Sequence, residues 1–157
     1  MIDLTLPGRN LVLELHHLML DVNGTLTVDG QLIPGVKERI KNLKDKLDIH
    51  LLTADTLGRG ADVATELGTK FSRVDANRGG QDKKEYLLKL GKDNTAAVGN
   101  GYNDVHMLEE AVLGIAVIGK EGCSAEAIRR ADIVVNNIND ALDLLLNPKR
   151  LIATLRA

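Results

Sequence analysis

The 157-residue chain carries 20 Lys and Arg against 22 Asp and Glu, and its net charge of −2 gives no electrostatic attraction for nucleic acid or anionic membranes. Its single cysteine excludes a disulfide framework and a cysteine-based metal cluster. The amino-terminal residues lack a basic segment followed by a long apolar run, and no apolar stretch reaches the length of a membrane span. We therefore expect a cytoplasmic protein without a signal peptide, and its length fits one domain.

Short apolar runs alternate with amphipathic segments along the chain. After a hairpin turn at 7–10, strands are expected at 11–15, 18–21, 49–52, 71–74, 96–98, 114–118 and 133–135. Helices are expected from Pro34 onward, at 60–67, 82–90, 104–111 and 125–130, and from about Asp140. This alternation predicts a doubly wound, Rossmann-like α/β fold with a parallel sheet. We expect one domain over residues 1–157, in which 1–17 form an amino-terminal hairpin extension.

The most informative stretch runs from Leu18 to Thr27, where an apolar segment ends abruptly on Asp21 and turns at Gly24. A buried strand of this kind delivers the aspartate to its own carboxyl end, and glycine allows a tight turn around a ligand. Ligands bind at that edge in open α/β sheets. An aspartate in this position can attack phosphorus and carry an aspartyl-phosphate.

Two other predicted strands also end on polar residues, and a lysine pair precedes the second of them. The polar residues are Thr53 and Asp55 after one strand, then Asn100, Asn103 and Asp104 after the other; the lysines are Lys83 and Lys84. These segments should converge at one edge of the sheet. A carboxylate nucleophile, hydroxyl and amide groups, a lysine and a divalent cation held by oxygen atoms are the parts that phosphoryl transfer requires.

These motifs, in this order, resemble the haloacid dehalogenase superfamily of aspartate-nucleophile phosphohydrolases. The resemblance is greatest to the phosphorylation domain of P-type ATPases and to their small soluble relatives, which lack a cap. It extends from about Leu18 to the carboxyl terminus. The matching segments are Asp21-Val-Asn-Gly-Thr-Leu-Thr27, Leu52-Thr-Ala-Asp55, Lys83, Gly99-Asn-Gly-Tyr-Asn-Asp104, Gly114-Ile-Ala-Val and Ala131-Asp-Ile-Val-Val.

The resemblance implies a role for each matching position. Asp21 becomes the nucleophile and a Mg²⁺ ligand, Thr53 binds the phosphoryl group and Lys83 pairs with it. Lys83 is preferred to Lys84 because Tyr86, Leu87 and Leu90 then form the packed face of its helix. The remaining assignments are Gly24, Thr25 and Asn103 for phosphate binding, and Asn23 through its carbonyl, Asn100 and Asp104 as further metal ligands.

Two residues depart from the pattern of the family. Asn23 stands where these phosphatases usually have an aspartate that protonates the leaving group, and an amide cannot exchange a proton at neutral pH. Asn100 replaces a metal-binding aspartate, which removes one negative charge and should weaken Mg²⁺ binding. We therefore expect slow turnover that favours acyl or aryl phosphates, whose leaving groups depart without being protonated.

Only 26 positions (53 − 27) separate Thr27 from Thr53, and a helix fills most of them, so a large cap domain does not fit. An uncapped site suits a large phosphorylated substrate or a site closed by a neighbouring subunit, and the turn at 28–31 is a candidate flap. The edge of the hairpin at 1–17 is a possible contact in a homo-oligomer.

Other hypotheses stay open at this point. A non-catalytic phosphate-binding or regulatory module would explain Asn23 and Asn100, and a receiver-like phosphoacceptor also uses Asp, Thr and Lys around Mg²⁺. His16 and His17 are interpreted as edge-strand residues because no acidic or third imidazole partner is near them in the sequence, and His50 belongs to no pattern.

Overall fold

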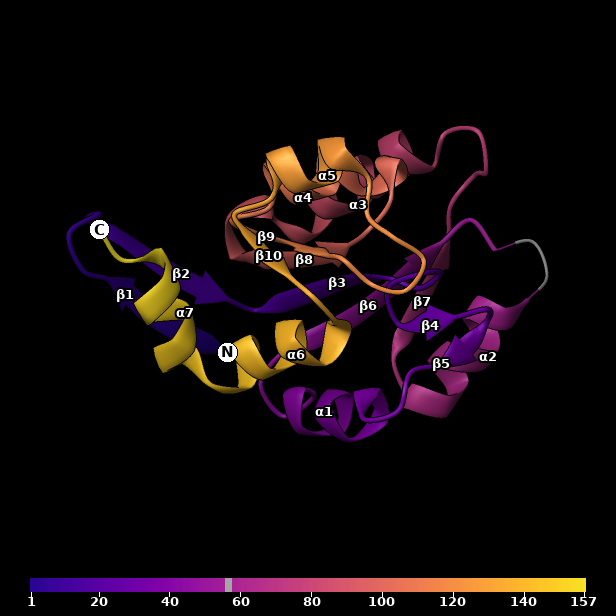
Figure 1. Ribbon diagram of the computed structural model, residues 1–157, viewed down its shortest axis with the longest axis horizontal. Helices are drawn as coiled ribbons and strands as arrows, with labels where there is room; N and C mark the ends of the chain where they lie inside the picture. The colour runs from indigo at the N-terminus through magenta and orange to yellow at the C-terminus, as the bar shows by residue number, and fades with distance from the viewer. Residues whose placement is uncertain (56–57) are drawn as a thin grey trace.

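The computed structural model describes residues 1–55 and 58–157. Its main feature is a six-stranded parallel sheet, in which the strand that ends on Asp21 lies between a strand on either side (Figure 1). In spatial order the strands are β10 (Ile133–Val135), β9 (Leu113–Val117), β8 (Thr95–Gly99), β3 (His17–Asp21), β6 (Asp48–Thr53) and β7 (Lys70–Arg73). After β3, the chain adds β6 and β7 on one side of that strand and then returns to add β8, β9 and β10 on the other side. The direction of strand addition therefore reverses beside β3, and in open α/β sheets ligands bind at the carboxyl ends of the strands where this reversal occurs.

Helices cover both faces of the sheet, which confirms the doubly wound α/β fold (Figure 1). Each layer encloses its own apolar core, and Leu18 and Leu20 face one core while Met19 faces the other. This alternation follows from the two-residue repeat of a strand. The first layer contains α1 (Val36–Leu43), α2 (Arg59–Leu67) and α6 (Ile138–Leu146); the second contains α3 (Gly79–Leu90), α4 (Val105–Glu110) and α5 (Ala125–Arg130).

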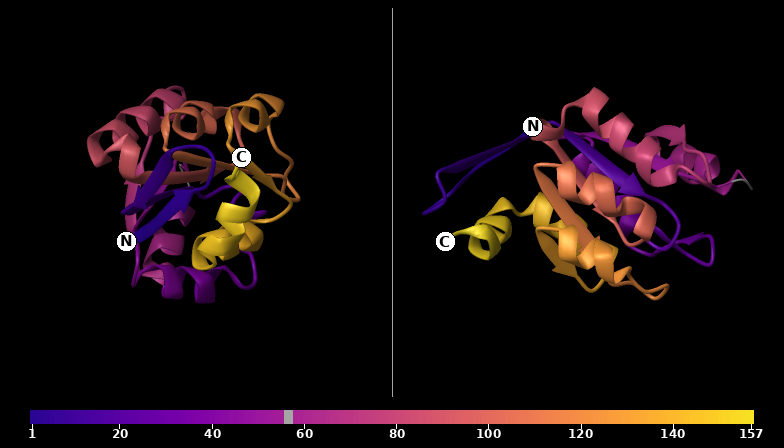
Figure 2. Two further views of the ribbon diagram at one scale, coloured as in Figure 1. Left: turned by 90° about the vertical axis from the view of Figure 1, so that its left-hand side faces the viewer. Right: turned by 90° about the horizontal axis from the view of Figure 1, so that it is seen from above.

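The amino-terminal hairpin extends beyond the sheet, as Figures 1 and 2 show. Strands β1 (Ile2–Leu6) and β2 (Leu11–Leu15) pair antiparallel, and alternate residues of β1 are buried. Helix α7 (Pro148–Leu155) packs against β1. The sequence predicted one carboxyl-terminal helix, but the structure has two, because Pro148 cannot continue α6 and instead begins α7.

Most other predicted elements are present, with small shifts at their ends. Helix α3 begins at Gly79 rather than Asp82, and short 3₁₀ turns precede β8 and α4 at Lys92–Asn94 and Tyr102–Asp104. The candidate flap is a small hairpin of β4 (Thr27–Val28) and β5 (Gln31–Leu32).

Asp29 and Gly30, at the tip of the β4–β5 hairpin, both adopt left-handed backbone angles, with φ of 52° and 77°. Two consecutive left-handed residues are what a tight two-residue hairpin turn requires. Between β3 and β6 the chain forms only this hairpin and α1, so no cap domain is present there. Across the described residues, we find no helix whose length and apolar character would let it cross a membrane.

Candidate active site

Asp21 is the last residue of β3, and its side chain is buried at the carboxyl edge of the sheet. The ammonium of Lys83 donates to one carboxylate oxygen, Oδ1, at 2.7 Å. The Thr25 hydroxyl donates to the other oxygen, Oδ2, at 3.0 Å. Both oxygens of the predicted nucleophile are therefore positioned by residues that the sequence analysis placed in the same site.

Lys83 has no exposed side-chain surface and also donates to Oδ1 of Asp104 at 2.7 Å. It lies on the face of α3 that carries buried Leu87, whereas Lys84 points outward and pairs with Glu110 at 3.1 Å. The structure thus brings Lys83, and not Lys84, to Asp21.

Asp104 holds the loop after β8 in place. Its Oδ2 accepts the backbone N–H groups of Asn100 and Gly101 at 3.0 and 2.9 Å, while Oδ1 is taken by Lys83. A Cβ atom on Gly99 would lie 2.4 Å from this carboxyl group, so glycine is needed there. Because both of its oxygens are engaged, Asp104 positions Lys83 and the loop, a role that the sequence analysis missed when it named only a metal ligand.

Asn100 faces the turn that follows Asp21. Its Oδ1 lies 3.1 Å from the Thr25 hydroxyl, whose one proton is shared between Asn100 and Asp21, and its Nδ2 donates to the carbonyl of Gly122 at 3.2 Å. Gly24 has a φ of +76°, and a Cβ there would lie 2.6 Å from Asn100 Nδ2. The left-handed backbone and the close approach together explain glycine at this position.

The remaining predicted residues lie at or after the carboxyl ends of β3, β6 and β8. The exposed Asn23 donates from Nδ2 to the Thr53 hydroxyl at a long 3.4 Å, and buried Thr53 ends β6. Asp55 accepts the backbone N–H of Gly60 and so supports the start of α2. Asn103 is exposed on the 3₁₀ turn, where its amide lies near Gly79 at the start of α3.

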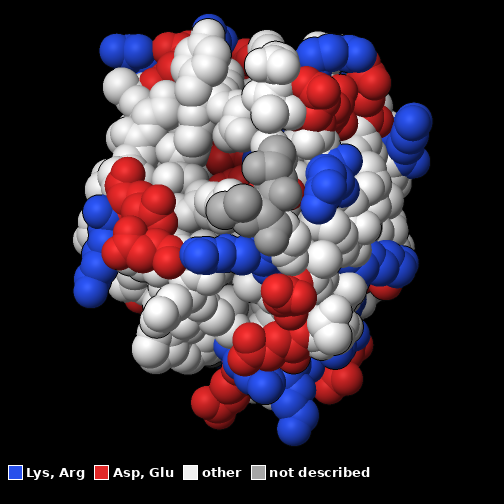
Figure 3. All heavy atoms as spheres, turned by 90° about the vertical axis from the view of Figure 1, so that its right-hand side faces the viewer, with Lys and Arg blue, Asp and Glu red and all other residues white. Residues whose placement is uncertain are grey.

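The carboxyl edge of the sheet opens into a hollow, and Figure 3 shows acidic atoms at its bottom. A cleft of about 620 Å³ adjoins Thr25, between the β4–β5 hairpin and the segments that follow β9 and β10. Lys120, Asn136 and Asn137 supply its polar lining on that side. The cleft therefore borders the predicted site at Thr25, while the Asp21 side chain itself is buried.

Charge is not balanced in the cluster of Asp21, Lys83 and Asp104, because one ammonium faces two carboxylates. Burial, and then the negative charge of Asp104, raise the pKa of Asp21 to about 6. Burial alone would lower the pKa of Lys83, but the two carboxylates outweigh it and hold that pKa above its ordinary value. With both carboxyl groups ionised, the cluster carries one net negative charge in a buried setting, which favours an additional cation.

A second group of side chains, which the sequence analysis missed, lies at the opposite end of β3. His17 faces Asp48, and His50 lies beside both, so the expectation that His17 has no acidic or imidazole partner was wrong. The three come together only because β3 and β6 pair in parallel with His17 opposite Asp48. Burial is the main cause that lowers the pKa of His50 to about 4.

Comparison with known sequences gives the site a family context. Residues 83–141 match the model of a family described as haloacid dehalogenase-like hydrolase. Over 91 residues (54% of this chain), the sequence is 48% identical to an uncharacterised protein of Methanocaldococcus jannaschii and covers 98% of it. Over 127 residues (79% of this chain), it is 29% identical to a soluble P-type ATPase-like phosphatase of the same organism, of which it spans 46%.

A similar fold occurs in 3-deoxy-D-manno-octulosonate 8-phosphate phosphatase from Moraxella catarrhalis, solved with a magnesium ion, a phosphate ion and a KDO molecule. The TM-score is 0.67 at 20% identity, and the match covers 90% of this chain and 94% of that one. At this identity the likeness concerns the fold alone, and it confirms the predicted architecture.

Replacing Lys83 with Met is expected to lower the free energy of unfolding by about 3–5 kcal/mol, because two buried carboxylates lose their shared counter-charge. Lys84→Met is the matched control, since it removes only the outward ion pair with Glu110 and should leave the melting temperature almost unchanged. Urea and thermal unfolding of both variants measure the difference. Equal losses in the two variants would contradict this account of Lys83.

Asp21→Asn is expected to stabilise the metal-free protein by ~1–3 kcal/mol above pH 6, because it removes the burial cost of an ionised carboxylate. The pKa of Asp21 rises from 3.8 to about 6 on folding. The protonated Asp21 side chain therefore makes its full contribution to stability below about pH 4, and this contribution is lost as the pH rises through 6.

The advantage of Asp21→Asn should consequently disappear near pH 4. Unfolding of both proteins across this pH range in chelator measures it, and the effect of His50, which is common to both, cancels in the difference. An advantage that is the same at every pH would count against a raised pKa at Asp21.

Proposed function

Because the chain belongs to the haloacid dehalogenase-like hydrolase family, we propose that it is a divalent-metal-dependent phosphohydrolase acting through an aspartyl-phosphate on Asp21. The observation that carries this proposal is the buried Asp21 carboxylate, held at the carboxyl end of β3 by Lys83 and Thr25. Asp21 ends β3 at the carboxyl edge of the sheet, on the side of the molecule where Figure 3 shows a hollow with acidic atoms at its bottom.

In the first step, an ionised oxygen of Asp21 forms a bond to phosphorus while the bond from phosphorus to the leaving-group oxygen breaks. In the second, water attacks the phosphorus, the acyl-phosphate bond breaks, and Asp21 and inorganic phosphate are released. Lys83 offsets negative charge beside the reacting oxygen, and the Thr53 hydroxyl stands at the rim where it can donate to a phosphate oxygen.

The chemistry of the donor groups fits a hard divalent cation, for which we propose Mg²⁺. Asp21 and Asn100 present oxygen atoms on either side of the Thr25 hydroxyl, and the cluster behind them keeps a net negative charge. Asp21, Asn100 and the carbonyl of Asn23 would hold the ion, together with Asp104, either directly or through water. When bound, the cation neutralises charge on the phosphoryl group and orients it.

Asn23 sets the expected rate. Its amide reaches the Thr53 hydroxyl but can neither supply a proton to a leaving group nor take one from water. General acid–base help is worth ~10²–10⁴-fold, so turnover should be slow for leaving groups that need a proton. The favoured substrates are therefore acyl or aryl phosphates, and the absence of a cap between β3 and β6 admits a large phosphorylated molecule.

A second candidate function is a non-catalytic phosphate-binding or regulatory module. Asn23 and Asn100 favour it, because each replaces an acidic group by a neutral amide. A receiver-like phosphoacceptor is less well supported, since the family match lies over residues 83–141 and includes the loop after β8.

Asn23→Asp is expected to raise Mg²⁺-dependent turnover of an alkyl phosphate by ~10²-fold or more, and that of an aryl phosphate by less, because only the alkyl leaving group needs the proton. Steady-state hydrolysis of both substrates by the unaltered protein, Asn23→Asp and Asp21→Asn measures this. Asp21→Asn should abolish turnover of both.

Equal turnover of alkyl and aryl phosphates by the unaltered protein would contradict the assigned role of Asn23. Retained activity in Asp21→Asn would remove Asp21 as the nucleophile. If all three proteins are inert while phosphate still binds, the regulatory module is the better description.

A further inference from the structure

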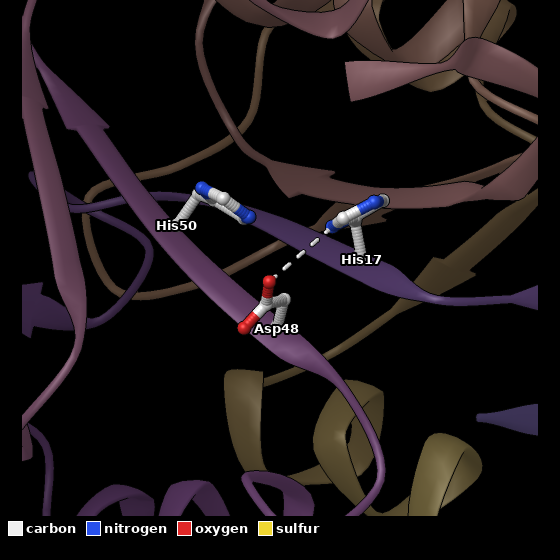
Figure 4. A group of neighbouring side chains, drawn as sticks. All are labelled: His17, Asp48 and His50. Atoms are coloured by element: carbon white, nitrogen blue, oxygen red, sulfur yellow. Dashed lines mark ion pairs between the residues drawn. The ribbon is translucent and has the colours of Figure 1, made fainter.

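His17, Asp48 and His50 form a compact group on the second-layer face of the sheet, which we call the histidine cluster (Figure 4). His17 begins β3 and lies opposite Asp48, the first residue of β6; His50 follows two residues later on the same face of β6. His17 is four residues from Asp21, or about 13 Å along the strand. The cluster is thus separate from the proposed phosphoryl-transfer site.

The geometry of the cluster is that of a set of ligands around a common point. One ligand atom from each residue lies within 4.8 Å of the other two, and His17 Nδ1 is 4.0 Å from Asp48 Oδ2. His17 Nδ1 and His50 Nε2 are both buried without a hydrogen-bond partner, and His50 is only 3% exposed. A buried polar atom left unpaired is costly, so its presence calls for a missing partner.

The surroundings of His50 fix which nitrogen is available. The other ring nitrogen, Nδ1, lies 3.0 Å from the hydroxyl oxygen of Tyr86 on α3. When Nδ1–H donates to that oxygen, Nε2 retains its lone pair and points into the cluster. Metal-binding histidines are commonly oriented by a second hydrogen bond of this type.

We infer that the histidine cluster binds a divalent transition-metal ion of the Zn²⁺ type through His17 Nδ1, Asp48 and His50 Nε2. Two imidazole nitrogens and one carboxylate oxygen suit Zn²⁺, with water in the fourth tetrahedral position, whereas Mg²⁺ prefers oxygen ligands only. Bonds of about 2.0–2.1 Å place tetrahedral ligands roughly 3.3 Å apart, so the side chains must close by about 1 Å. His17 and Asp48 are partly exposed and can make that movement.

Lys70 competes with the ion for Asp48. Its ammonium lies 2.8 Å from Asp48 Oδ2, and both side chains are more than half exposed. An incoming cation would displace Lys70 toward solvent at small cost, because exposed ion pairs contribute little. The bound ion would then join β3 to β6 and, through His50 and Tyr86, fix the helix that also carries Lys83.

The test is titration of the full chain with Co²⁺ and then Zn²⁺, in buffer containing excess Mg²⁺ to occupy the oxygen-lined site. We expect one equivalent of Co²⁺ to give the visible absorption of a tetrahedral ion, Zn²⁺ to displace it, and Zn²⁺ to raise the melting temperature. His17→Gln should reduce affinity at least tenfold. His16→Gln is the matched control, because the adjacent His16 is exposed and lies outside the cluster, and it should bind as the unaltered protein does.

Lys70→Gln provides a test that no loss of folding can imitate, since removing the competing ammonium should tighten Zn²⁺ binding several-fold. The inference is overturned by no binding at one equivalent, by an octahedral Co²⁺ spectrum, or by equal affinity in His17→Gln and His16→Gln. Weaker binding in Lys70→Gln would also overturn it. None of these readouts depends on phosphatase activity.

Discussion

The Lys83 ammonium, buried between the carboxylates of Asp21 and Asp104, is the contact on which the proposed site depends. It joins the end of β3, the loop after β8 and helix α3, which are far apart in the sequence. Taking several charges out of water is costly, and one ammonium offsets only part of that cost for two carboxylates. The cost that Lys83 does not offset is seen in the raised pKa of Asp21. The cation that we propose for the site would supply the missing positive charge.

Much of this arrangement follows from local sequence signals. The apolar run before Asp21 and the polar ends of two further strands predicted the edge at which they meet, and the packed face of α3 distinguished Lys83 from Lys84. Prediction failed where the answer depended on contacts between distant segments. The engagement of both Asp104 oxygens requires the folded loop, and the histidine cluster exists only through the register between β3 and β6. The break at Pro148, in contrast, is a local signal, and the expectation of a single carboxyl-terminal helix did not take it into account.

The two ends of β3 present different chemistry on one strand. At the carboxyl end, Asp21 and Asn100 offer oxygen atoms suited to a hard cation, and neutral Asn23 leaves the proposed reaction without a proton donor. At the amino-terminal end, His17 and its partners on β6 offer nitrogen atoms suited to a softer metal. Helix α3 contacts both ends, through Lys83 at Asp21 and through Tyr86 at His50.

Direct detection of the covalent intermediate tests the central claim. The protein is mixed with acetyl phosphate or an aryl phosphate and Mg²⁺, quenched in acid, reduced with borohydride and mapped by peptide mass spectrometry. The account predicts reduction of a single acyl-phosphate at Asp21, absent in Asp21→Asn and accumulating because Asn23 slows the attack of water. Labelling at another carboxylate, or steady hydrolysis with no labelled residue in the quenched protein, would contradict it.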